Sequence, residues 1–235
     1  QIRYTHRLTQ RRSRSEKPEW VYNLDLAAQL LKDFELQVST VCPPYLAIPA
    51  ERLTEWRKRL AQSLSLSETA RWLFVHVGSG GSANNLTLEQ YERLVVALSE
   101  RLPEWQFVLT AGPDEEAVVG GVYTRLLTKH VPAALWVSKE GLDAFAQGMA
   151  TADAMVAGST GPLHIAGALD VPTVGFYPRL QSSTALRWQT LNKPSRHLAV
   201  SVPEQSNDPE SFASLDIEEV ADRITTFFSG IKPSA

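Results

Sequence analysis

The chain has 235 residues, of which 43% are hydrophobic and 21% are charged. It is therefore long enough to bury a sizeable hydrophobic core. The formal net charge of −3 argues against a protein whose whole surface serves nucleic acid, because such domains are usually strongly basic. A single cysteine, Cys42, excludes an internal disulfide framework and is compatible with a reducing cytoplasm. No run of about 18 apolar residues occurs, so we expect no membrane-spanning helix.

The first 17 residues form a strongly basic segment. Six cations and one acid, Glu16, make it five charges positive. We interpret the segment either as a solvated linker between two halves of a protein or as a contact to an anionic acceptor or membrane surface. Nucleic acid is a poorer partner, because few aromatic residues lie between the arginines. The cations are Arg3, Arg7, Arg11, Arg12, Arg14 and Lys17.

Helical spacing of apolar residues predicts a helix within residues 18–36, after which three prolines interrupt the pattern between 37 and 50. We interpret 37–50 as a connector and place a domain boundary near residue 45. An amphipathic helix follows from Glu51, and we expect its basic face to be solvated. The chain starts at Gln1 rather than Met, and we therefore expect an upstream part of the protein to be absent from this sequence.

From residue 72 onwards, apolar strand-like runs alternate with helical patterns. The run at 72–77 has the length and the lack of polar alternation of a fully buried strand. The next helix is predicted to begin at Thr87, which forms a capping-box pattern with Gln90. Further strands are predicted at 105–112, 133–138, 154–157, the end of 158–178 and 196–203, with helices between them and a terminal helix within 214–231.

This alternation predicts parallel pairing with right-handed crossovers, and hence an open sheet covered by helices on both faces. We assign residues 46–235 to one Rossmann-like α/β domain of roughly six strands. In such sheets, ligands bind beyond the carboxyl ends of the strands, where the strand order reverses. The residues that follow each strand are therefore the candidates for a binding site.

The sequence GSTGPLHIAGALDVPTVGFYP, residues 158 to 178, has the pattern of a strand end, a turn, a helix and a second strand. Ser159, Thr160 and Gly161 fall where a buried strand precedes a helix, so hydroxyls and free backbone N–H groups meet there, as in an anion site. His164 lies four residues after Thr160, and we expect both side chains to share a helix face and to point at one ligand. The alternative for His164 is an ordinary buried core histidine.

Two other strand ends supply candidates. In the sequence GSGGS at 78–82, the small residues permit close backbone approach, and hydroxyls such as Ser82 can donate to phosphate oxygens. It matches neither a Walker loop nor GxGxxG, so a plain tight loop is the alternative. After the second strand, Glu115 and its acidic neighbours fit ordinary helix initiation or a carboxylate that accepts from ribose hydroxyls.

The remaining patterns exclude other kinds of site. The five histidines show no metal-like spacing, and no cluster of histidine, cysteine and carboxylate residues indicates zinc. We therefore expect neither a metal ion nor another cofactor. A Ser/His/Asp hydrolase is unsupported, because no G-x-S-x-G elbow is present.

Three of these sequences together resemble a known family. HVGSGGSANNLTLEQYERL, LTAGPDEEAV and VAGSTGPLHIAGALDVPTVGFYP are similar to the carboxyl-terminal domain of glycosyltransferase family nine, the lipopolysaccharide heptosyltransferases. The resemblance covers most of the chain. It implies the carboxyl-terminal half of a two-domain GT-B architecture, with residues 1–45 as the end of the amino-terminal acceptor domain and its connector, and 46–235 as the nucleotide-sugar domain.

The activity that the resemblance implies is an inverting sugar transfer from a nucleotide-activated donor, typically ADP-heptose, to a growing lipopolysaccharide core. The partners would be the nucleotide-sugar and an anionic lipid-linked saccharide, met in the cytoplasm at the inner face of the inner membrane. The basic segment would then face that acceptor. Two alternatives remain open: a non-catalytic nucleotide-binding or scaffold protein of the same fold, and a nucleotide-sugar epimerase of related fold.

The resemblance also carries site residues to individual positions. The family's hydroxyl pair falls on Ser79 and Gly80, and its phosphate-binding lysine falls on Asn84, which cannot supply a positive charge. Its ribose-binding acid falls near Glu115 or Glu116. The family's Asp-Thr-Gly-x-x-His motif has serine in place of the aspartate here, and its other members match Thr160, Gly161 and His164. The family's general base, an aspartate near the start of the amino-terminal domain, has no matching position in this chain.

Overall fold

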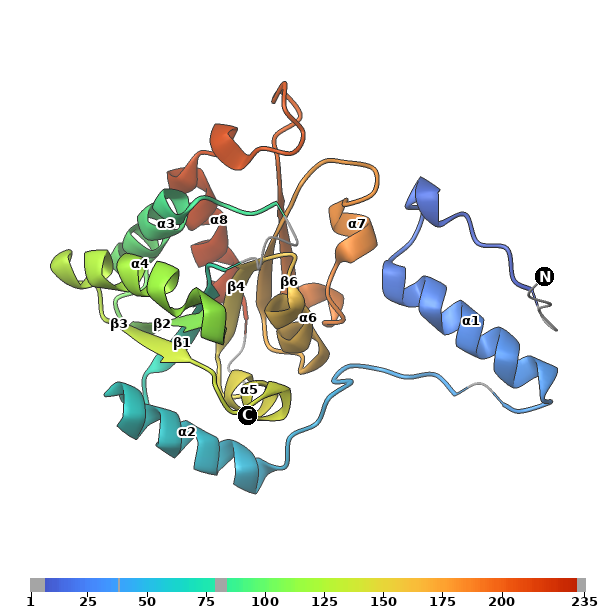
Figure 1. The fold of residues 1–235 in the computed structure, drawn as a ribbon, viewed down its shortest axis with the longest axis horizontal. Helices are drawn as coiled ribbons and strands as arrows, with labels where there is room; N and C mark the ends of the chain where they lie inside the picture. Colours follow the sequence, from blue (N-terminus) through green and yellow to red (C-terminus); the bar gives the residue numbers. More distant parts are fainter. Residues whose placement is uncertain (1–6, 38, 79–83, 232–235) are drawn as a thin grey trace.

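A computed structural model describes residues 7–37, 39–78 and 84–231. It contains a six-stranded sheet with helices on both faces, and a separate helix, α1, beside one edge of this body (Figure 1). The strands are β1 Arg71–His76, β2 Trp105–Ala111, β3 Ala133–Val137, β4 Ala154–Gly158, β5 Thr173–Tyr177 and β6 His197–Ser201. The helices are α1 Glu19–Asp33, α2 Ala50–Leu64, α3 Leu88–Arg101, α4 Glu116–Thr128, α5 Leu142–Met149, α6 Gly161–Ala168, α7 Ala185–Trp188 and α8 Ile217–Ser229.

All neighbouring strands pair in parallel, in the order β3-β2-β1-β4-β5-β6. The chain therefore builds outwards from β1 to β3 and then returns to the centre at β4. The order reverses between β1 and β4, and the loops after these two strands leave in opposite directions and open a crevice. The predicted parallel α/β sheet is confirmed. The short helix α7 was not predicted, because four residues carry too little periodicity.

Successive residues of β1 point to opposite faces of the sheet, as the pleat requires. Leu73 and Val75 join a hydrophobic cluster that includes side chains of α3, α4 and α8. Trp72 and Phe74 join a second cluster with side chains of α2, α5 and α6. This is why the run at 72–77 shows no polar alternation: both of its faces are buried.

Local capping signals fix where two helices begin. The hydroxyl of Thr87 accepts from the backbone N–H of Gln90, and the Gln90 side chain accepts from the backbone N–H of Thr87, which confirms the predicted capping box. At the start of α8, the Asp216 carboxylate accepts from the backbone N–H of Glu218 at 3.0 Å. The predicted terminal helix is confirmed as well.

The expectation that the basic face of α2 is solvated holds for Arg52, Lys58 and Arg59, which are exposed, but not for Arg57. The Arg57 guanidinium lies 3.5 Å from the centroid of the Trp72 ring. The same group donates to the backbone oxygen of Thr151 and to the carboxylate of Asp153. Burial lowers the pKa of Arg57, although Asp153 opposes this shift. The cause is tertiary: the turn before β4 supplies acceptors that the helical pattern alone does not reveal.

The connector between α1 and α2 lies against the body. The backbone N–H groups of Tyr45 and Leu46 donate to the backbone oxygen of Ala168, at 2.7 and 2.9 Å. Among the residues described, no helix combines the length and the apolar composition that crossing a bilayer would require.

Candidate functional site

A cavity of about 560 Å³ lies beyond the carboxyl ends of β1, β2 and β3, against the start of α6. We call it the switch-point cavity. Five of its lining side chains are polar or charged, and they come from four different strand ends or the loops that follow them. Its polar members are His76, Glu115, Ser138, Lys139 and Thr160, and its bulky apolar members are Leu142, Phe145, Pro162 and Ile165.

The carboxylate in this cavity belongs to Glu115. It lies in the short helical turn Pro113–Glu115 between β2 and α4. Its Oε2 atom accepts from the backbone N–H of Gly112 at 3.1 Å and lies 3.8 Å from Nε2 of His76. A Cβ atom at position 78 would lie 2.0 Å from Oε1 of Glu115, so any larger residue there would displace this carboxylate. The geometry leaves the carboxylate packed against the backbone at the carboxyl end of β1.

His76 is the last residue of β1 and is almost fully buried. Its Nδ1 atom lies 3.0 Å from the hydroxyl of Thr110 on β2. Burial lowers the pKa of His76, and the nearby Glu115 carboxylate partly opposes this shift. The imidazole is therefore neutral near pH 7. Sequence reasoning missed His76 as a site residue, although a polar residue at the end of an apolar strand was a signal that could have found it.

Thr160 and Gly161 bring the amino end of α6 to the cavity. Thr160 is the N-cap residue, with φ −123° and ψ 169°, and its hydroxyl lies 3.3 Å from the backbone oxygen of Gly158. Gly161 begins the helix, and Pro162 in its first turn contributes no N–H group. The backbone donors and the helix dipole of α6 can stabilise an anion here. Thr160 and Gly161, two of the residues predicted to bind an anion, therefore line the same cavity as Glu115.

A buried tyrosine fixes the two strand ends that flank the switch point. The hydroxyl of Tyr91 on α3 donates to Oδ1 of Asn85 at 2.6 Å and accepts from the N–H of Gly158 at 2.9 Å. Burial raises the pKa of this hydroxyl, which therefore stays protonated. The Asn85 amide also donates to the backbone oxygen of Gly78, at 3.4 Å. The sequence offered no signal for this network beyond the position of Tyr91 on a buried helix face.

Two of the predicted residues, Asn84 and Ser159, do not line this cavity. Ser79, Gly80 and Ser82 fall outside the residues that the structure describes. Asn84 is exposed and lies away from the lining of the cavity, with its amide 3.5 Å from the carboxylate of Glu210. Ser159 is half-buried and is not among the residues that line the cavity.

His164 and Thr160 line different cavities, contrary to the expectation that they face one ligand. The rule that residues four apart share a face holds within a helix, but Thr160 is an N-cap with extended backbone angles. His164 lines a smaller cavity of about 180 Å³ between α1, α6 and α7, which we call the α1–α7 cavity. Burial lowers the pKa of His164. The residues of this cavity are Glu19, Trp20, Asn23, His164, Arg187, Trp188, Gln189 and Leu191.

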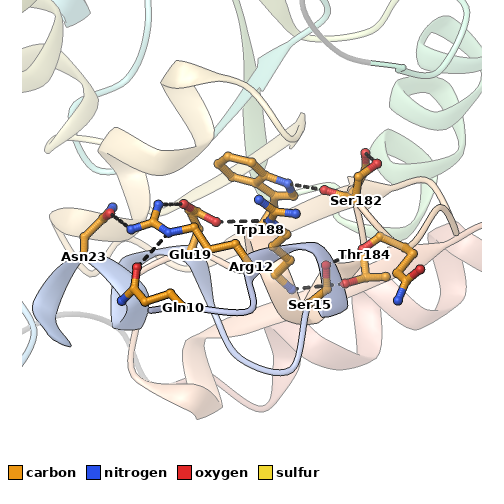
Figure 2. A network of polar contacts seen from close by, with 11 residues as sticks. Gln10, Arg12, Ser15, Glu19, Asn23, Ser182, Thr184 and Trp188 are labelled. Atoms are coloured by element: carbon orange, nitrogen blue, oxygen red, sulfur yellow. Dashed lines mark hydrogen bonds and ion pairs between the residues drawn. The ribbon is translucent and has the colours of Figure 1, made fainter. Parts of the chain in front are cut away.

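A polar network attaches α1 and the basic segment to the body (Figure 2). Glu19 forms ion pairs with Arg12 and with Arg187, and Arg12 also donates to the Asn23 side chain at 3.0 Å. The Ser15 hydroxyl donates to the backbone oxygen of Gln181. Arg12 and Arg187 are therefore partnered within the chain. Arg7, Arg11 and Arg14 are exposed, and Arg14 pairs with the exposed Glu16 at 3.6 Å.

Comparison with known proteins shows similarity to one family across most of the chain. The model of glycosyltransferase family 9 (heptosyltransferase) matches residues 6–211. A candidate glycosyltransferase of Haemophilus influenzae is 40% identical over 227 residues, which cover 97% of this chain and 65% of the relative. This chain therefore spans about two thirds of the length of that relative.

Solved structures show the same fold at lower identity. A family 9 glycosyl transferase of Veillonella parvula aligns with a TM-score of 0.71 at 14% identity, over 94% of this chain and 62% of that one. ADP-heptose lps heptosyltransferase II of E. coli aligns with a TM-score of 0.65 at 16% identity, over 82% and 56%. At such identities the likeness establishes the fold alone.

Proposed function

The chain belongs to glycosyltransferase family 9, and from this premise we propose that its switch-point cavity binds the nucleotide-sugar donor of an inverting sugar transfer. The observation that carries the proposal is the convergence of Glu115, Thr160 and the start of α6 on one cavity at the point where the strand order reverses. The diphosphate of such a donor needs hydrogen-bond donors and a positive potential, and its ribose needs a hydrogen-bond acceptor. The start of α6 can meet the first need, and the Glu115 carboxylate can meet the second.

The lining supports one orientation of the donor. The diphosphate would lie at the amino end of α6, where Thr160 and Gly161 line the cavity. The Glu115 carboxylate would accept from the ribose hydroxyls. The base would pack in the apolar half, against Leu142 and Phe145. The sugar attached to the diphosphate would then extend out of the cavity on the side of α6.

The proposed sugar is heptose and the proposed nucleotide is ADP, because the family is described by its heptosyltransferases. Asn84 stands where the resemblance expects a lysine and is turned to Glu210. The leaving diphosphate would depend on the α6 dipole and backbone N–H groups instead. Donor identity is the part of the proposal most sensitive to this change.

We also propose that residues 1–45 form the end of an acceptor domain and its connector, with the catalytic base in a part of the protein outside this sequence. The acceptor would be an anionic lipid-linked saccharide of the lipopolysaccharide type, reached at the inner face of the cytoplasmic membrane. The exposed arginines Arg7, Arg11 and Arg14 support this choice, because they precede α1 on one side of the body.

Thermal unfolding with ADP, GDP, UDP and their sugars tests the donor site. A ligand at 100 times its Kd stabilises the folded state by about 2.7 kcal/mol, which raises the melting temperature by several degrees. Glu115→Gln and Thr160→Val should each remove most of this rise, whereas Glu89→Gln, an exposed change on α3, should leave it intact. If none of the nucleotides raises the melting temperature, the donor-site proposal is wrong.

Release of nucleoside diphosphate by the full-length protein, in the presence of a lipopolysaccharide core oligosaccharide, tests the transfer. Binding together with acceptor-dependent release would support a transferase. Binding without release would instead identify a nucleotide-binding protein that lacks transfer chemistry.

A further inference from the structure

The α1–α7 cavity has an unusual density of aromatic rings for its size. Two indole side chains, Trp20 from α1 and Trp188 from α7, line it together with the imidazole of His164 on α6. The ring centroids of His164 and Trp188 lie 6.4 Å apart at 61°, close to an edge-to-face arrangement. The cavity thus has aromatic walls from three separate elements.

Polar groups between these walls are held in fixed positions. The Glu19 carboxylate is oriented by Arg12 on one side and by Arg187 at 3.1 Å on the other. The Asn23 amide is oriented by Arg12 at 3.0 Å, as Figure 2 shows. The indole nitrogen of Trp20 is buried and has no hydrogen-bond partner among the described residues. A buried donor of this kind costs about 1–3 kcal/mol unless a ligand or water accepts from it.

Flat aromatic walls and fixed carboxylate, amide and guanidinium groups suit one class of ligand. The C–H faces of a pyranose ring are apolar and can pack on indole rings, while its equatorial hydroxyls need donors and acceptors around the rim. We propose that the α1–α7 cavity binds one pyranose ring of the saccharide acceptor, and that the Trp20 indole N–H, which is buried in this structure, turns to donate to a sugar hydroxyl. The proposal rests on the proposed transferase function.

The position of the cavity on α6 favours the acceptor over the sugar of the donor. Gly161 and Ile165 face the switch-point cavity, whereas His164 faces the α1–α7 cavity, so the helix separates the two sites. A donor sugar remains attached to a diphosphate at the start of α6, and none of residues 158–162 lines the α1–α7 cavity. The basic segment lies on the same side of the body as this cavity and matches an anionic acceptor.

Fluorine NMR of the chain labelled with 5-fluorotryptophan tests the site directly. The probes are methyl α-D-mannopyranoside, a deacylated and phosphorylated lipopolysaccharide core oligosaccharide, and ADP-glucose. We expect the core oligosaccharide to shift the resonances of Trp20 and Trp188, while Trp105, which is stacked on Phe228 in the core, stays unchanged. The monosaccharide should shift the same two resonances at higher concentration.

A matched pair of variants links the shift to the indole N–H. Trp20→Phe keeps an aromatic wall and removes the indole N–H, so it should weaken binding of the oligosaccharide about tenfold. Trp56→Phe makes the same chemical change on α2, where the indole donates to Gln147 at 2.9 Å, and should leave the affinity unchanged. Asn23→Ala serves as a second variant if Trp20→Phe alters the far-UV circular dichroism.

Each outcome separates this inference from the donor site. If nucleotides raise the melting temperature but no sugar shifts Trp20 or Trp188, the saccharide site is wrong and the donor site stands. If ADP-glucose shifts these resonances and the core oligosaccharide does not, the cavity belongs to the donor sugar and the inference is overturned. If the oligosaccharide shifts them and no nucleotide stabilises the chain, the saccharide site stands without the proposed function.

Discussion

The α/β body and the segment of residues 7–33 are held in place by different forces. In the body, Phe74 is fully buried on a central strand, and both faces of the sheet are covered by hydrophobic clusters. On α1, the side chains of Leu24 and Leu30 are 42% and 53% exposed, and Phe34 just after the helix is 66% exposed. What attaches this segment is mainly the polar network around Glu19.

This difference bears on the two proposed sites. The switch-point cavity is built on strand ends that the hydrophobic core holds rigid, so it is preorganised for its ligand. The α1–α7 cavity takes one wall from a segment attached by hydrogen bonds and ion pairs, whose net contributions are small. The donor site should therefore tolerate changes that the acceptor site does not.

The largest difference in stability should appear when one phenylalanine ring is removed from each region. Phe74→Ala should lower the free energy of unfolding by about 3–5 kcal/mol, because it leaves a cavity beside Trp136. Phe34→Ala removes a ring that is mostly exposed, and it should change the free energy of unfolding by less than about 0.5 kcal/mol. Urea denaturation of both variants measures the contrast. Comparable losses would mean that α1 shares the core after all.

Acid should weaken the body through His197 on β6. Its Nδ1 lies 2.8 Å from the Thr173 hydroxyl, and burial, together with the neighbouring His164, lowers its pKa from 6.5 to about 4. Between pH 6.5 and about 4, the unfolded chain therefore binds a proton at His197 that the folded chain does not bind. The free energy of unfolding falls as the pH drops through this range.

The expected loss is on the order of 1.4 kcal/mol for each pKa unit, or about 3–4 kcal/mol over this range. Urea midpoints measured at intervals across the range should show a shallower acid limb for His197→Gln than for the unmodified chain. Parallel curves for the two proteins would show that His197 does not titrate in this way.

Tyr91→Phe should affect the body and the donor site together. It leaves the N–H of Gly158 without its partner hydroxyl, at a cost of about 1–3 kcal/mol. Nucleotide affinity should fall as well, because Gly158 precedes the turn at Thr160. Tyr123→Phe is the control, since its hydroxyl makes no hydrogen bond within the described residues. Equal stability of the two variants would rule out the assigned role of Tyr91.

The smallest effect on the body should come from Glu19→Gln. The change removes the charge that holds Arg12 and Arg187, so residues 7–33 should detach more often. Limited trypsin digestion should cut the basic segment faster, while the urea midpoint of the body moves by less than about 0.5 kcal/mol. Glu55→Gln, which breaks an exposed pair with Arg52, should change neither. Unchanged digestion of Glu19→Gln would show that another contact holds the segment.

Much of the fold followed from local patterns. The buried run at 72–77 and the capping box at Thr87 predicted elements that the structure contains within a residue or two. The strand-to-helix turn at Thr160 was likewise predictable, because a hydroxyl before Gly-Pro and an apolar helix is a local signal. The role of Arg57 was not, since its acceptors come from the turn before β4, far along the chain.

The sequence by itself determined the α/β class, the six parallel strands and the strand ends that supply Glu115 and Thr160, because these depend on hydrophobic periodicity and turn chemistry over a few residues. Tertiary structure alone decided which side chains meet. It placed His76 in the switch-point cavity, joined Tyr91 to the end of β4 at Gly158, and placed His164 in a separate cavity with Trp20 and Trp188. These contacts depend on strand order and on helix rotation, which bring together residues as far apart in the sequence as His76 and Glu115 or Trp20 and His164 and leave no local pattern in the chain.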